Sequence, residues 1–71
     1  MADTKTLLEI ADRGAASTRE FIKHVRERVT HYQEAGELAE TDLHDRLLAS
    51  LEQVLAFEEE TATRLRAEMN N

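Results

Sequence analysis

The sequence predicts an all-α protein, an antiparallel hairpin of two long helices joined by a short turn at residues 36–41. Three observations support this fold class. The 71 residues include no proline and only two glycines, so little interrupts a helix. Apolar residues recur with heptad spacing in two separate segments. One glycine, Gly36, lies between those segments, where the chain must reverse.

The first helix is predicted at about residues 5–35. Its amino end has three competing cap signals: Asp3, Thr4, and a capping box over residues 6–9. Its carboxyl end is marked by Gly36, because glycine adopts the left-handed conformation that commonly ends a helix.

The second helix is predicted at about residues 42–69. Thr41 or Asp42 is expected to cap it, since both side chains accept hydrogen bonds from the first turn of a helix. Acidic residues also gather in this region, and they suit the positive end of a helix dipole.

Both predicted helices carry a heptad seam, made of two series offset by three residues. The first helix has Leu8, Ala15, Ile22 and Val29, with Ala11, Thr18, Val25 and Tyr32. The second helix has Thr41, Leu48, Leu55, Ala62 and Met69, with His44, Leu51, Glu58 and Leu65. An antiparallel alignment that reverses at Gly36 sets small Ala15 opposite small Ala62, and it places the two seams in contact.

The chain is expected to be a single domain, residues 1–71, that self-associates. A domain of this size is marginal alone, and the absence of cysteine excludes disulfides as reinforcement. Apolar residues beside the seams make a stripe too wide for one partner helix, which predicts a homodimer in the form of a four-helix bundle. The predicted self-association or partner interface is Phe21, Ile22, Val25, Val29, Leu47, Leu48, Leu51, Val54, Leu55 and Phe57.

Glu58 is the one glutamate at a seam position, where it faces Thr18. A buried carboxylate is costly unless it is paired, so three arrangements stay open. The Thr18 hydroxyl and Arg19 satisfy it, water enters beside the small Ala15–Ala62 layer, or the seam opens there to a partner. Thr18 and Glu58 are expected to form a polar layer that sets the register of the helices.

The leading functional hypothesis is a small, non-catalytic protein-interaction or regulatory module that self-associates and binds a protein partner. No glycine-rich phosphate loop and no nucleophile with an adjacent base is present in the sequence. A bundle this small also has little volume for a catalytic cleft. Neither enzymatic activity nor a cofactor is expected.

A nucleic-acid-binding homodimer is the alternative. Arg19, Lys23 and Arg26 share one helix face, which a symmetric dimer would double into a phosphate-binding surface. A short hairpin dimer looks like the RNA-binding Rop-type bundles in architecture, although no residue motif matches. The net charge of −6 argues against this hypothesis.

A carboxylate-bridged metal bundle is the third hypothesis. Such sites use a Glu-x-x-His motif, whereas here the Glu20–His24 and Glu27–His31 pairs are spaced by four residues.

No apolar run reaches the roughly 18 residues of a membrane span. The amino end lacks the pattern of a secretory signal, so the expected location is the cytoplasm.

Overall fold

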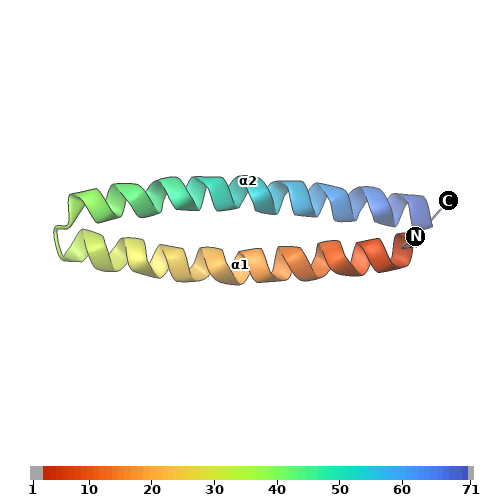
Figure 1. Ribbon diagram of the computed structural model, residues 1–71, viewed down its shortest axis with the longest axis horizontal. Coiled ribbons are helices and arrows are strands. Elements are labelled where there is room, and N and C mark those ends of the chain that lie inside the picture. The colour runs from red at the N-terminus through yellow and green to blue at the C-terminus, as the bar shows by residue number, and fades with distance from the viewer. Residues whose placement is uncertain (1–2, 71) are drawn as a thin grey trace.

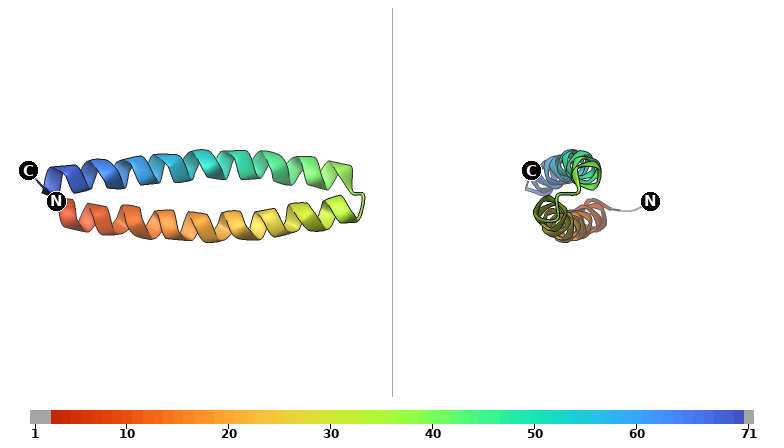
Figure 2. Two further views of the ribbon diagram at one scale, coloured as in Figure 1. Left: turned by 180° about the vertical axis from the view of Figure 1, so that it is seen from behind. Right: turned by 90° about the vertical axis from the view of Figure 1, so that its left-hand side faces the viewer.

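Two antiparallel α-helices lie side by side along their full length, as Figure 1 shows. The computed structural model describes residues 3–70, with α1 at Thr4–Glu34 and α2 at Leu38–Met69. Figure 2 shows the connecting turn at one end of the rod and the outer ends of both helices at the other. The predicted all-α hairpin is confirmed. Residues 1, 2 and 71 of the predicted domain lie outside the described part of the chain.

α1 begins one residue earlier than predicted because Asp3 is its cap. The Asp3 side chain accepts a hydrogen bond from the backbone N–H of Thr6 at 2.8 Å. This bond satisfies one of the N–H groups that the first turn of a helix leaves without a partner. It also lowers the pKa of Asp3, because the backbone N–H and the Thr6 side chain both stabilise the charged carboxylate.

The turn is shorter than the predicted 36–41, and α2 begins at Leu38 rather than at residue 42. Gly36 has a φ of 73°, and its N–H donates to the carbonyl of Gln33. The N–H of Glu37 donates to the carbonyl of Tyr32, which completes the Schellman arrangement of crossed hydrogen bonds. This arrangement reverses the chain within the three residues 35–37.

The predicted caps of the second helix, Thr41 and Asp42, are wrong because the helix already begins at Leu38. The residues after Glu37 include good helix formers, so the second helix continues directly from the compact turn. The hydroxyl of Thr41 donates to the carbonyl of Glu37 inside the first turn of α2, and Glu37 itself makes no side-chain cap bond.

The core is one narrow line of side chains between the helices. Its buried members are Ala15, Ile22, Val25, Val29 and Ala62, and all five are predicted seam residues. Four come from α1 and one from α2. The leucines of the α2 seam are only half-buried. The apolar surface of α2 is therefore only partly covered by α1.

Candidate interaction surfaces

The contact line between the helices follows the predicted seam. Within the described residues every predicted seam residue is buried or half-buried except Met69, which is 49% exposed at the open end of the hairpin. Two predicted pairs are seen directly. The hydroxyl of Thr18 contacts Glu58, and the rings of Tyr32 and His44 pack with their centroids 4.9 Å apart.

The predicted interface residues separate into two groups. Six belong to the contact between the two helices of one chain: Ile22, Val25 and Val29 are buried, and Leu48, Leu51 and Leu55 are half-buried. The other four are exposed: Phe21 at 52%, Leu47 at 40%, Val54 at 48% and Phe57 at 69%. Only the second group leaves a large part of its surface available to another molecule.

Large exposed apolar side chains gather on one side of the seam, called here the apolar face. Its members recur at helical spacing: Leu7, Ile10, Phe21, Leu43, Leu47, Val54 and Phe57. In the described part of the chain, only Leu38 and Met69 are exposed large apolar residues outside this face, and each lies at an end of α2. A contiguous apolar surface on a small protein marks an interaction site.

Two grooves interrupt the apolar face. One, of about 420 Å³, lies toward the open end between Leu7 and Phe57, with Gly14 and Glu58 among its lining residues. The other, of about 240 Å³, lies toward the turn and is lined in part by Phe21 and Leu47. The face is therefore uneven, and the small residue Gly14 lines the larger of the two hollows.

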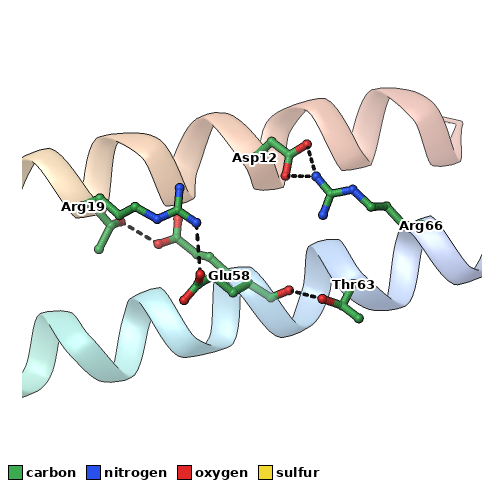
Figure 3. A network of polar contacts seen from close by, with 7 residues as sticks. Asp12, Arg19, Glu58, Thr63 and Arg66 are labelled. Atoms are coloured by element: carbon green, nitrogen blue, oxygen red, sulfur yellow. Dashed lines mark hydrogen bonds and ion pairs between the residues drawn. The ribbon is translucent and has the colours of Figure 1, made fainter.

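The other side of the seam carries a row of ion pairs. Asp12–Arg66, Arg19–Glu59 and Arg26–Glu52 join α1 to α2 at 2.7, 3.0 and 3.2 Å. They recur every seven residues. In Figure 3, Asp12 and Arg66 approach each other from the two helices, and Nη2 of Arg66 donates to both carboxylate oxygens. Exposed pairs of this kind each contribute up to about 1 kcal/mol.

Sequence reasoning missed this row, although its signal is present. All the charged pairs at these positions beside the seam are opposite in sign only in the observed register, whereas each neighbouring heptad register includes one like-charge pair. Sliding α2 by one heptad in one direction would bring Asp12 opposite Glu59. Sliding it in the other direction would bring Arg19 opposite Arg66. Both slips create a like-charge pair, so the row disfavours the neighbouring registers.

The predicted polar layer is present, with one partner corrected. The Thr18 hydroxyl donates to Oε1 of Glu58 at 2.6 Å. Arg19, which was considered as a second partner of Glu58, pairs with Glu59 instead. The side chain of Arg19 leaves the helix on the ion-pair side of the seam, whereas Glu58 lines the groove on the apolar side.

Gly14 makes room for the Glu58 carboxylate. A Cβ atom at position 14 would collide with Oε2 of Glu58, so the carboxylate lies directly against the glycine backbone. Glycine inside a helix costs about 0.5–1 kcal/mol relative to alanine, which makes a mid-helix glycine a sequence signal for close packing. Sequence reasoning did not use that signal.

Two of the three residues proposed to bind nucleic acid are already paired with acids. Arg19 and Arg26 contact Glu59 and Glu52, whereas Lys23 is exposed on the same helix. Phosphate binding by these arginines would compete with carboxylates of the same chain. The geometry therefore weakens the nucleic-acid hypothesis.

The histidines lie apart from the seam glutamate. His24 is exposed and lies 3.4 Å from Glu20 and 3.8 Å from Glu27. His44 packs on Tyr32, and its Nδ1 lies 2.8 Å from the carbonyl oxygen of Glu40. Over residues 3–70 of one chain, no group of three or more His, Cys, Asp or Glu side chains is arranged to hold a metal ion.

Comparisons with known proteins do not assign the chain to a family. No protein-family model matches the sequence, and neither curated proteins nor solved structures show a significant similarity to it. Neither of the two described helices combines the length and the apolar character needed to cross a membrane.

Proposed function

We propose that the chain is a small, non-catalytic protein-interaction module that self-associates through its apolar face and binds a protein partner. The observation that carries the proposal is the concentration of exposed Phe21, Leu47, Val54 and Phe57 on one side of the hairpin. Fully burying such side chains contributes about 1.5–3 kcal/mol each. A hairpin whose core is a single line of residues gains a large part of its stability from that contact.

Self-association is tested with one variant on each side of the hairpin. Phe57→Glu introduces a charge on the apolar face, and Ala49→Glu introduces the same charge at an exposed position outside that face. Sedimentation equilibrium at micromolar concentration is expected to give a dimer for the wild type and for Ala49→Glu. Phe57→Glu is expected to sediment as a single chain. A folded monomer for the wild type would refute the proposal.

The surface proposed for the protein partner is the acidic outer side of α2. Asp45 and Glu60 are exposed there, and they lie outside the apolar face. Acidic residues at the edge of an interface chiefly raise the association rate with a basic partner. A self-associated module would still present this surface on both copies.

Partner binding is tested by cross-linking in the native host followed by mass spectrometry. The expected partner cross-links to α2, and it is lost when Asp45 and Glu60 are changed to Asn and Gln. It is retained when Glu9 and Glu34 of α1, which are also exposed, are changed to Gln. Equal recovery with both double variants would place the partner elsewhere.

A further inference from the structure

The apolar face is built from successive rungs, each with one residue from α1 and one from α2. The register of the hairpin is defined by contacts such as Thr18–Glu58 and Arg26–Glu52. In this register Gly14 lies opposite Thr61, and both line the groove near the open end. Arg28 lies opposite Leu47, and both line the groove near the turn. The rung of Phe21 and Val54 lies midway between them, seven residues from each.

These rungs differ in size in a complementary way. The Gly14–Thr61 rung is small and forms part of a hollow of about 420 Å³. The Arg28–Leu47 rung has two long side chains and lines the smaller hollow, of about 240 Å³. Rotating a second copy end for end about the Phe21–Val54 rung places the Arg28–Leu47 rung of each copy over the small rung of the other. Protein interfaces reach the packing density of interiors, which favours a pairing that fills the hollow.

The same rotation pairs opposite charges. Glu58 places its carboxylate against Gly14 inside the mostly apolar groove, with one oxygen accepting from Thr18. Arg28 lies beside the other groove, with its guanidinium 5.9 Å from the centre of the Tyr32 ring. Because Arg28 and Gly14 are equally distant from Phe21, the reversed copy brings the partner's Arg28 to Gly14, where the Glu58 carboxylate lies.

We propose that a second copy of this chain covers the apolar face in a reversed orientation, with the two-fold axis at Phe21 and Val54 and the partner's Arg28 bound to Glu58. The proposal rests on the self-association proposed above and adds its geometry. A carboxylate in an apolar groove is costly alone and favourable when it accepts charge-assisted hydrogen bonds. The groove at Gly14 in each copy is completed by Arg28 of the other copy.

The opposite orientation, with both turns at the same end, lacks these matches. In that orientation the Gly14–Thr61 rungs of the two copies lie at the same height along the rod, so the two hollows face each other. Arg28 then stays ten residues from the level of Thr18 and Glu58, which is about 15 Å along a helix. The reversed pairing fills the hollow and supplies the cation.

Spin labels distinguish the two orientations, and the absence of cysteine makes single labelling sites simple. Glu34→Cys and Glu20→Cys place labels at exposed positions two heptads apart on the same side of α1. The reversed dimer separates the labels at position 34 by about 40 Å along the rod and those at position 20 by about 3 Å. Double electron–electron resonance is therefore expected to give a much longer distance for Glu34→Cys. Equal distances would refute the reversed orientation and leave self-association intact.

A double-mutant cycle tests the bond between Arg28 and Glu58. Arg28→Met is expected to weaken dimerisation at least about tenfold, while Arg13→Met, at an exposed site outside the apolar face, has no effect. In a Glu58→Gln background the effect of Arg28→Met should shrink. An undiminished effect would mean that Arg28 acts only through its contact with Tyr32. A monomeric wild type would refute both this inference and the proposed self-association.

Discussion

Glu58 and Gly14 pack against each other, and the absence of a side chain at Gly14 leaves the space that the Glu58 carboxylate fills. Glu58 occupies a seam position that heptad repeats usually fill with an apolar residue. Its carboxylate accepts from Thr18 and lies against the backbone of Gly14, where no Cβ atom would fit. The polar layer therefore depends on a hydroxyl and on a missing methyl group.

Replacing Gly14 by Ala is expected to stabilise the protein by less than the usual gain. Alanine is better than glycine inside a helix by about 0.5–1 kcal/mol, but here its Cβ displaces the Glu58 carboxylate from Thr18. In a Glu58→Ala background the full gain should return. Urea denaturation at a fixed chain concentration measures both values. A full gain with Glu58 intact would show that the carboxylate moves aside at no cost.

Replacing Glu58 by Leu is expected to stabilise the single hairpin and to broaden the distribution of oligomers. Leucine removes the cost of a partly buried charge from the single hairpin, but it also removes the partner of Arg28 in the proposed dimer and the polar layer that favours one register. Thermal melting and sedimentation velocity measure the two effects, with Glu60→Leu as the exposed control. The register-setting role is wrong if neither stability nor oligomeric state changes.

Each helix is defined by its ends and by what lies on either side of its seam. Asp3 caps the start of α1, and the Schellman turn around Gly36 ends it. Along the length, one flank is ionic and the other apolar. The ionic flank favours the observed alignment of α1 with α2, and the apolar flank stays exposed in the single chain, where we propose that a second copy binds.

Charge reversal at Arg26 is expected to destabilise the hairpin more than charge reversal at Lys23. Arg26→Glu places a glutamate of α1 opposite Glu52 of α2. Exposed Lys23, in contrast, contributes no ion pair between the helices. The expected difference is about 0.5–1 kcal/mol, and Glu52→Arg should restore the loss. Urea denaturation at low and high salt measures it. Equal effects of the two reversals would indicate that the ion pair contributes nothing.

The Asp3 cap predicts a pH dependence at the start of α1. Folding lowers the pKa of Asp3, so its contribution is present above the ordinary pKa and is lost as the pH falls through the lowered value. Asn caps a helix without titrating. Between about pH 5 and pH 2, wild-type protein should therefore lose more thermal stability than Asp3→Asn. Parallel melting curves of the two proteins across this range would contradict the assignment.

The whole molecule is a thin rod, 52 Å long and 14 Å across its narrowest dimension. A rod of two helices buries one seam and exposes most of its surface. Among the exposed apolar residues, Phe21 and Val54 would be covered by the proposed reversed copy, so the proposed folded unit includes two chains. Stability and association should then be linked.

That linkage predicts a melting temperature that depends on chain concentration. Raising the concentration favours the associated state by mass action, so the wild type should melt at higher temperature when it is more concentrated. Phe57→Glu, on the exposed apolar face, should remove this dependence, and Ala49→Glu should retain it. Circular dichroism melts over a hundredfold concentration range provide the measurement. A wild-type curve that does not shift would indicate a stable single hairpin.

The sequence alone determined the two helices, their antiparallel alignment and the Thr18–Glu58 layer. Heptad spacing and a glycine between the helices are one-dimensional signals that need no knowledge of distant contacts. Only the tertiary structure decided the compact turn that starts α2 at Leu38, the pairing of Arg19 with Glu59, and the packing of the Glu58 carboxylate against the backbone of Gly14. Those features depend on backbone hydrogen bonds and side-chain directions across the seam. A pattern of residue types leaves these undetermined.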